Sequence, residues 1–288
     1  MFELKGTSLD DFLSIKEVKE MLKEKQIQEV AFEENKEQET KEENEIIRIH
    51  FKNAKEFIEH LKLLQTIDDE AWFKVTNEGL QYSQLDPSKI SALFMKFKGE
   101  IENIKECKFS IYLRDFLAII SNEDLKQMNN KDLTFEIDIV NKKARILSII
   151  NIEGESLFEE EYNEYSDFPE PKAILDAEAE VNLANLLNAI KGFETVRLIL
   201  EIDKEDRLIA EARKETISKK SIINAKIING KNETTSIYDV NFLSNFLKKV
   251  IKLKKIANLR FSNKMPLNIK FETSIAEISY WLAPRVEE

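Results

Sequence analysis

Two stretches, SIYLRDFLAII at residues 110–120 and SIYDVNFLSNF at residues 236–246, decide the expected fold of this chain. Their Ser, Ile, Tyr, Phe and Leu positions coincide at an offset of 126 residues, which is 236 − 110. A helical pattern and then an apolar strand pattern follow each copy. The repeat indicates two similar domains in tandem. We predict an α+β fold with domain 1 at residues 46–168, an interdomain loop that starts near residue 160, and domain 2 at residues 169–288.

Antiparallel strands and a few amphipathic helices are expected in both domains. The stretch KNAKEFIEHLKLLQ at residues 52–65 predicts a helix. Two short strands are expected in AWFKVTNEGLQYSQL at residues 71–85, around a turn at Asn77-Glu78-Gly79. A hairpin that turns at Asn141-Lys142 is expected within residues 131–152.

Residues 1–45 have a different composition from the rest of the chain. Residues 29–45, EVAFEENKEQETKEENE, hold eight acids and two lysines, and such a segment buries too little apolar surface to fold. We therefore interpret it as a disordered linker. Before it, GTSLDDFL at residues 6–13 begins a helical pattern that is expected to be marginal on its own.

The composition favours an intracellular binding protein and offers little support for an enzyme. The 288 residues carry a net charge of −11, with 42% apolar and 34% charged residues. A single cysteine, Cys107, fits a reducing compartment, and the chain has neither a secretory signal pattern nor an apolar run of membrane-spanning length. The sequence contains no GxGxxG, HExxH, GxSxG or CxxC motif. We predict a non-enzymatic protein without cofactor or metal, in which Cys107 is a core residue and His60 a surface or groove residue.

Lysines cluster on two of the predicted helices. FLKKVIKLKK at residues 246–255 holds five, and residues 52–62 hold three more. In a chain of net charge −11, this clustering indicates that charge is segregated on the molecule. Ordinary solvated helix faces are one interpretation. The other is contact with nucleic-acid phosphates without base readout.

Two further stretches carry a resemblance to a known family. DEAWFKVTNEGLQYSQLDPSKISAL at residues 69–93 and NKMPLNIKF…ISYWLAPRVEE at residues 263–288 resemble the proliferating-cell-nuclear-antigen type of DNA sliding clamp, with the archaeal branch as the best fit. The resemblance covers residues 46–288. It implies a trimeric ring around duplex DNA, with helices near residues 53–66, 113–121, 182–191 and 239–251 lining the hole and sheets outside.

The resemblance also implies what the protein does and where its partners bind. It implies a DNA polymerase processivity factor in the cytoplasm, at the nucleoid, with DNA polymerase, a clamp loader, flap endonuclease and ligase-type enzymes as partners that dock through short peptides. The DNA-facing residues implied are Lys55, Lys62, Arg114, Lys191, Lys248, Lys249 and Lys252. The implied peptide pocket comprises Leu85, Ile90, Phe168, Pro169, Pro266, Trp281, Ala283 and Pro284. Strands at residues 156–165 and 218–227 are expected to meet between subunits, through Leu157, Glu159, Glu161, Lys219, Lys220 and Lys226.

The N-terminal segment resembles a ligand of such a pocket. Leu9 matches the aliphatic position of the expected peptide pattern, and Phe12 and Leu13 match its paired anchor, although Gly6 replaces the usual glutamine. Docking of this segment in a pocket is one hypothesis, and an amphipathic tail with another partner or none is the other. Two alternatives for the whole chain stay open. One is a regulatory clamp subunit of a heterotrimer whose tail blocks partner pockets, and the other is an enzyme whose dispersed acids converge in the fold.

Overall fold

The computed structural model describes residues 46–158, 168–192, 197–214, 216–230 and 234–285. The chain divides into two compact units, Met1–Ile46 and Ile47–Glu288, and apart from Ile46 every described residue lies in the second unit. The extension predicted at residues 1–45, with Leu9, Phe12 and Leu13, lies outside the described residues.

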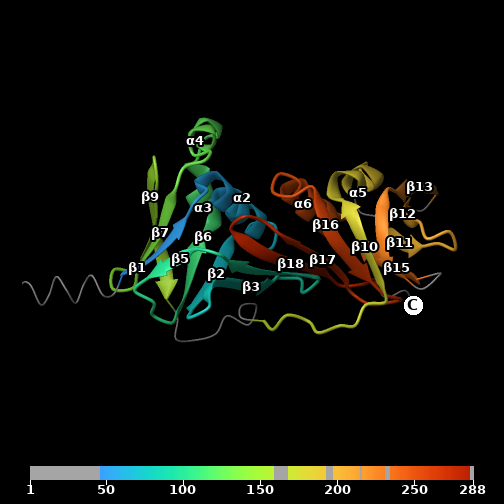
Figure 1. The fold of residues 1–288 in the computed structure, drawn as a ribbon, viewed down its shortest axis with the longest axis horizontal. Helices are drawn as coiled ribbons and strands as arrows, with labels where there is room; N and C mark the ends of the chain where they lie inside the picture. Colours follow the sequence, from blue (N-terminus) through green and yellow to red (C-terminus); the bar gives the residue numbers. More distant parts are fainter. Residues whose placement is uncertain (1–45, 159–167, 193–196, 215, 231–233, 286–288) are drawn as a thin grey trace, which may run out of the picture. The chain divides into compact units, whose positions relative to one another are not determined.

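The second unit repeats one order of elements, a strand, a helical segment and then further strands, four times (Figure 1). The first two repeats are β1 (Ile46–Phe51), α2 (Ala54–Leu64), β2 (Glu70–Thr76), β3 (Gly79–Leu85), β4 (Ser91–Phe97) and β5 (Glu100–Glu102), then β6 (Cys107–Tyr112), α3 (Leu113–Ala118), α4 (Asn122–Gln127), β7 (Leu133–Asp138), β8 (Lys143–Leu147) and β9 (Asn151–Phe158). The last two are β10 (Ala177–Asn182), α5 (Leu183–Ile190), β11 (Arg197–Ile202), β12 (Leu208–Lys214), β13 (Ile217–Ile223) and β14 (Ala225–Asn229), then β15 (Thr234–Asp239), α6 (Val240–Val250), β16 (Ile256–Phe261), β17 (Leu267–Glu272) and β18 (Ala276–Leu282).

The sequence repeat corresponds to equivalent places in this order. Its first copy runs from β6 into α3, and its second copy runs from β15 into α6. The expected α+β class with two similar halves is therefore confirmed. The expected turns are also present, because Gly79 has a φ of +127° between β2 and β3, and Lys142 has a φ of +52° between β7 and β8.

The two halves share one sheet. Its strand order is β14-β10-β16-β17-β18-β4-β3-β2-β6-β9-β8-β7-β1-β5, and β13-β12-β11-β15 form a second sheet. The seam between the halves is the antiparallel pair β4·β18, in which Leu93 lies opposite Tyr280 and Met95 opposite Ile278. The backbone hydrogen bonds of this pair make the two halves a single structural unit.

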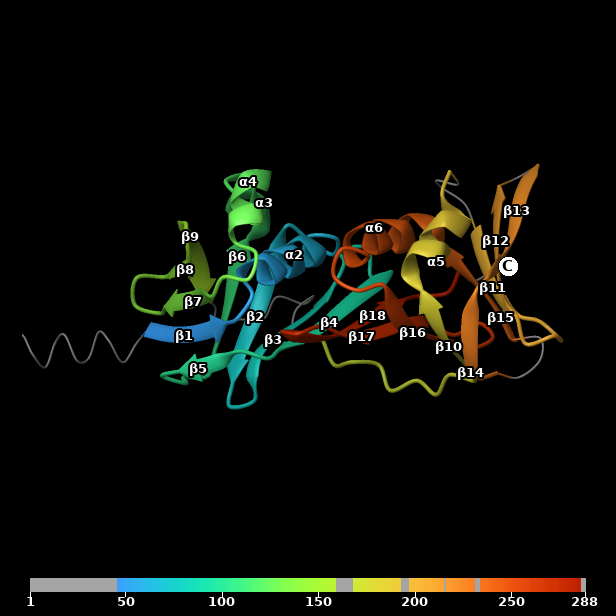
Figure 2. The same ribbon diagram turned by 45° about the horizontal axis from the view of Figure 1, so that its top comes forward.

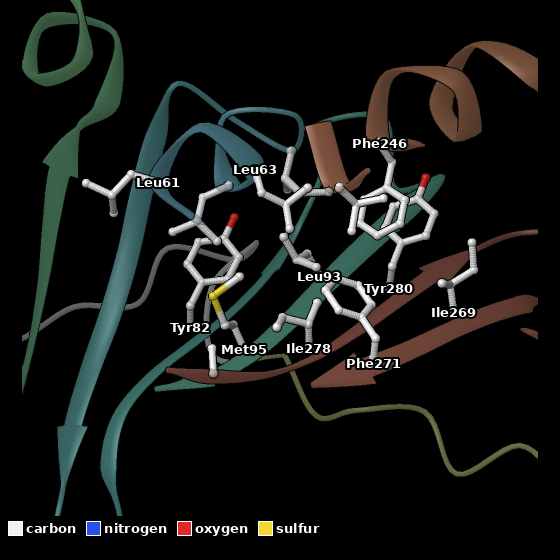
Figure 3. Packing of buried hydrophobic residues seen from close by; sticks show 14 of the residues in the cluster. Leu61, Leu63, Tyr82, Leu93, Met95, Phe246, Ile269, Phe271, Ile278 and Tyr280 are labelled. Atoms are coloured by element: carbon white, nitrogen blue, oxygen red, sulfur yellow. The ribbon is translucent and has the colours of Figure 1, made fainter. Parts of the chain in front are cut away.

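The helices form a layer on one side of the strands (Figures 1 and 2). Helix α2 packs against α3 and α6, and α5 packs against α6, so contacts link helices from both halves. Their apolar faces are buried against the sheets, as periodic apolar positions in an amphipathic helix require. Figure 3 shows this core at the seam, where the ring of Phe246 from α6 stacks on Tyr280 from β18 at 3.9 Å between centroids.

Two expectations about the helices are wrong. The helix expected at residues 113–121 ends at Ala118, and α4 begins separately at Asn122, because Ser121 and Asp124 form a capping box that starts a new helix. His60 is fully buried rather than on the surface. It lies one helical turn from Phe57, on the face of α2 that packs into the core. The other three helices lie where they were expected, with ends that differ by one to two residues.

Candidate functional site

Helix α6 presents the densest group of lysines on the helix layer. Asp239 caps its start by accepting a hydrogen bond from the Asn241 backbone N–H at 2.8 Å. The face with Leu243, Phe246, Leu247 and Val250 is buried, so the lysines of the last turn lie on the faces left open. Lys248 and Lys252 are exposed and Lys249 is half-buried. Lysines in a last turn also interact favourably with the helix dipole.

The predicted DNA-facing cations of the first half differ from those of α6, because acids neutralise two of them. Lys62 pairs with Glu59 at 3.1 Å between Nζ and Oε1. Arg114 pairs with Asp69, and this hydrogen bond raises the pKa of the guanidinium. Lys55 is half-buried on α2, and Lys191 is exposed directly after α5.

A strap of residues 168–176 crosses the side of the sheet opposite the helices (Figure 1). Three hydrogen bonds hold it: Ser83 Oγ donates to the Phe168 carbonyl at 2.9 Å, Trp281 Nε1 donates to Glu170 Oε1 at 3.2 Å, and the Asp176 N–H donates to Ser262 Oγ at 2.5 Å. The strap therefore links β3, β18 and the end of β16, which are elements of both halves.

An apolar cluster separate from the main core lies under the strap. Trp281 is only 6% exposed there, and Leu175 of the strap covers it together with Ala92 and Phe94 of β4. Leu85, Ala173 and Met265 pack at its edge. The strap thus shields an apolar surface that would otherwise be open to water.

Two hollows lie beside this cluster. One of about 440 Å³ is lined by Phe168, Pro169 and Glu170 of the strap together with residues of β3, β4, β17 and β18. The other, of about 570 Å³, is lined by Ile199, Ile237 and Pro284, with Lys264 and Arg285 at its rim. Both hollows combine apolar with polar and charged lining residues, a mixture that can hold a peptide through apolar contacts and hydrogen bonds.

The loop between β3 and β4 is held by a single carboxylate. Asp86 is 4% exposed and accepts hydrogen bonds from the backbone N–H groups of Ser88 at 2.8 Å and Ile90 at 2.9 Å. It also accepts from Ser91 Oγ at 3.0 Å. The Ile90 carbonyl in turn accepts from the Ala283 N–H at 2.8 Å. Asp86 thereby fixes the loop against the end of β18, beside the apolar cluster.

The side chains of Cys107 and His60, which could act in catalysis elsewhere, lie in surroundings that shift their pKa values by burial. Burial raises the pKa of the Cys107 thiol to about 11, so the thiolate is scarce near neutral pH. Burial also lowers the pKa of the His60 imidazole, whose Nδ1–H donates to the Glu56 carbonyl at 2.6 Å while Nε2 accepts from Thr273 Oγ1 at 3.1 Å. Within the described residues, no group of three or more His, Cys, Asp or Glu is placed to hold a metal. No described helix is long and apolar enough to span a membrane.

Comparison with solved structures decides the fold. The chain superposes on proliferating cellular nuclear antigen from Entamoeba histolytica with a TM-score of 0.71 at 17% identity, over 83% of this chain and 99% of that one. It superposes on the A. fulgidus antigen, solved with the C-terminal region of FEN-1, with a TM-score of 0.69 at 16% identity, over 84% and 99%. This is the sliding-clamp fold.

Curated sequences give the same relationship. The chain is 26% identical over 260 residues to the DNA polymerase sliding clamp of Thermofilum pendens, across 84% of this chain and all of the relative. It is 27% identical over 267 residues to that of Thermococcus gammatolerans, across 83% and 98%. No family model matches. The resemblance inferred from residues 69–93 and 263–288 is therefore confirmed as a similarity to DNA polymerase sliding clamps over 83% to 84% of the chain.

Within the clamp fold, the predicted pocket residues are divided among several places. Leu85 and Trp281 meet in the apolar cluster, Phe168 and Pro169 line the first hollow, and Pro284 lines the second. Ile90 packs against the main core instead. Pro266 and Ala283 are half-buried, and they are the sequence neighbours of Met265 and Pro284 respectively. Sequence reasoning missed Phe94, Ala173, Leu175 and Met265, which no local pattern connects.

The predicted subunit edges of the clamp are also divided. Residues 218–227 are not one strand, because β13 ends at Ile223 and β14 starts at Ala225 in the other sheet. Lys219 and Lys220 lie on β13, but Lys226 lies on β14 opposite Glu180. The backbone of Leu157 belongs to β9, whereas Glu159 and Glu161 lie outside the described residues.

Proposed function

We propose that three copies of this chain close head to tail into a ring that encircles duplex DNA and acts as a non-enzymatic processivity factor for DNA polymerase. One observation carries the proposal: a body with the sliding-clamp fold bears a continuous helix layer with four lysines, at positions 191, 248, 249 and 252, that have no ion pair among the described residues. Contacts between lysines and DNA phosphates carry no sequence information, which suits a protein that slides along DNA. The place of action is the DNA in the cell interior.

The internal repeat supports a specific way of closing the ring. At the 126-residue offset, β4 (residues 91–97) corresponds to β13 (residues 217–223) with both ends matched. Strand β4 pairs with the last strand of the other half, β18, whereas β13 is the edge strand of its sheet. By the same symmetry, β13 pairs in a neighbouring copy with the last strand of domain 1, β9, along residues 151–155, because β6 already pairs with β9 at residues 156–158. A heterologous contact of this kind closes into a ring when the rotation fits.

The β4·β18 register predicts the register between copies. Phe94 lies opposite Ser279 at the seam, and the offset converts this pair to Lys220 opposite Glu153, since 94 + 126 = 220 and 279 − 126 = 153. Lys220 and Glu153, which carry opposite charges, then face each other across the interface.

Reversing the charge of Lys220 tests this edge. Lys220→Glu is expected to turn trimers into monomers in light scattering after size exclusion, because two acids would then lie opposite each other at the interface. Lys172→Glu is the matched control, since Lys172 is exposed on the strap. Trimers that survive Lys220→Glu as well as Lys172→Glu would contradict the pairing of β13 with β9.

The strap side of the clamp is proposed to dock partner enzymes through short peptides with an aliphatic and an aromatic anchor. The A. fulgidus relative binds the C-terminal region of FEN-1. In this chain the two hollows supply apolar wall residues, Phe168 and Pro169 in the first and Ile199, Ile237 and Pro284 in the second. A labelled peptide of that pattern is expected to bind the wild type and to lose affinity at least about tenfold on Pro284→Glu, which puts a charge into the second hollow. Equal affinities would reject this surface.

The function as a whole is tested by topological retention on DNA. Linear duplex is fixed to a bead at one end, incubated with the full chain, and then blocked at the free end. A sliding ring stays on the blocked DNA through a high-salt wash and leaves when a restriction enzyme cuts the duplex. Protein that the salt wash removes equally from blocked and open DNA would show ordinary electrostatic binding and would reject the clamp function.

A further inference from the structure

The cations of the helix layer fall into two groups that differ in their partners. In the first half, acids pair with Lys62, Arg114 and Lys126, and of the DNA-facing cations predicted there only the half-buried Lys55 has no ion pair among the described residues. In the second half, Lys191, Lys248, Lys249 and Lys252 have no ion pair among the described residues. A cation already paired with an acid forms a site of zero net charge, which attracts a phosphate weakly and releases few counterions. The two halves therefore offer a DNA backbone unequal attraction.

The acids of the layer follow the same division. Helices α5 and α6 contain no acidic residue. The segment α3–α4 carries Asp115, Glu123 and Asp124, all exposed or half-exposed. At the repeat offset, Glu123 stands where the second half has Lys249, since 249 − 126 = 123. At this position of the repeat, the first half therefore repels DNA phosphates and the second half attracts them.

The difference has a structural cause in the helix break. The capping box of Ser121 and Asp124 starts α4 at the place in the repeat where α6 continues without interruption. A helix N-terminus favours acids and a helix C-terminus favours lysines, because of the helix dipole. Glu123 and Asp124 lie in the first turn of α4, and Lys248 and Lys249 lie in the last turn of α6. The helix break therefore places a helix start, which favours acidic residues, where α6 approaches its end, which favours lysines.

We propose that the second half of each subunit, through Lys191 and the α6 lysines, binds the phosphates, and that α3–α4 keeps the backbone away from the first half. This inference rests on the proposed function. At physiological salt the Debye length is about 8 Å, so each charged group acts mainly on the phosphates next to it. DNA inside the ring is then held at three patches, one in each subunit, rather than evenly around the hole.

The test compares the salt dependence of DNA binding between matched variants of the full chain. Binding to a short fluorescein-labelled duplex with open ends is followed by fluorescence anisotropy from about 50 to about 200 mM salt. The steepness of log K against log salt decreases by about 0.9 for each phosphate that the protein no longer neutralises.

Three variants are compared with the wild type. The second-half variant is Lys248→Gln/Lys249→Gln/Lys252→Gln. The first-half variant, Glu59→Gln/Lys62→Gln/Asp69→Asn/Arg114→Gln, removes two cations at constant net charge. A third variant, Lys172→Gln/Lys264→Gln/Lys270→Gln, removes three positive charges away from the helix layer.

The second-half variant is expected to lower the steepness by about 2.7 or more, while the other two leave it within error. A fourth variant, Glu123→Gln, is expected to raise the affinity for DNA about two- to threefold, because it removes a repulsive charge and frees Lys126. Equal slopes for the first-half and second-half variants, with a wild type that binds, would overturn this inference alone. A wild type without salt-dependent binding would overturn the proposed function instead. Light scattering on each variant verifies that assembly is unchanged.

Discussion

The seam between the two halves predicts a large and shared loss of stability when Leu93 is truncated. Leu93 on β4 is fully buried, lies opposite Tyr280 of β18, and belongs to the core that Figure 3 shows. Leu93→Ala removes three carbon atoms, worth roughly 2.4 kcal/mol at about 0.8 kcal/mol per methylene. The stacked rings of Tyr280 and Phe246 resist collapse into the space, so a cavity cost of about 1 kcal/mol adds to this. The expected total is about 3 to 4 kcal/mol.

Urea unfolding followed by tryptophan fluorescence measures this loss in each half. Trp72 lies on β2 and Trp281 on β18, so single-tryptophan backgrounds, Trp281→Phe and Trp72→Phe, report on the two halves separately. Leu93→Ala is expected to lower the unfolding midpoint equally in both backgrounds, compared with each parent at the same protein concentration. Ile174→Ala, at an exposed position, is the control and is expected to cost less than about 0.5 kcal/mol. A loss below about 1 kcal/mol, or one seen in only one half, would refute the reasoning that the halves share one core.

Three further predictions concern polar groups that are buried or half-buried. Because the folded-state pKa of His60 is lowered, the unfolded chain binds more protons below about pH 6.5, and stability should be complete above that pH and fall below it. Thermal unfolding at about pH 7.5 and about pH 5.5 is expected to show a smaller drop for His60→Gln than for the wild type, and an equal drop would count against the linkage. Asp86→Ala is expected to cost about 2 to 3 kcal/mol in urea unfolding, since it strands buried backbone donors of its loop, and a neutral effect would contradict the role given to this carboxylate. Cys107 is expected to react slowly with a thiol reagent near pH 8 and faster in denaturant, whereas equal rates would contradict its burial.

Much of the fold could be predicted from sequence because its signals are local. The repeat at Ser110 and Ser236 correctly placed two strand-to-helix transitions, apolar periodicity placed α2 and α6, and the family resemblance placed α5. The break between α3 and α4 was missed, although Ser121 followed three residues later by Asp124 is a recognisable helix start. The burial of His60 was missed because its residue type outweighed its position on the apolar face of α2.

The candidate sites were less predictable because they depend on contacts between distant segments. The apolar cluster joins Ala92, Leu175 and Trp281, which are far apart in the chain and share no periodic pattern. The pairing that neutralises Arg114 likewise depends on Asp69, which the fold brings beside α3. Sequence patterns identified which residues carry charge. Which of these charges are paired with an acid followed only from their neighbours in the structure.

The ring itself is the central claim, and images of the full chain test it most directly. Negative-stain electron microscopy of the purified protein is expected to show closed rings with threefold symmetry and an open centre, at a mass of about 101 kDa, three times the 33.6 kDa of one chain. Particles that are single crescents of one chain, or compact assemblies with a filled centre, would contradict the account.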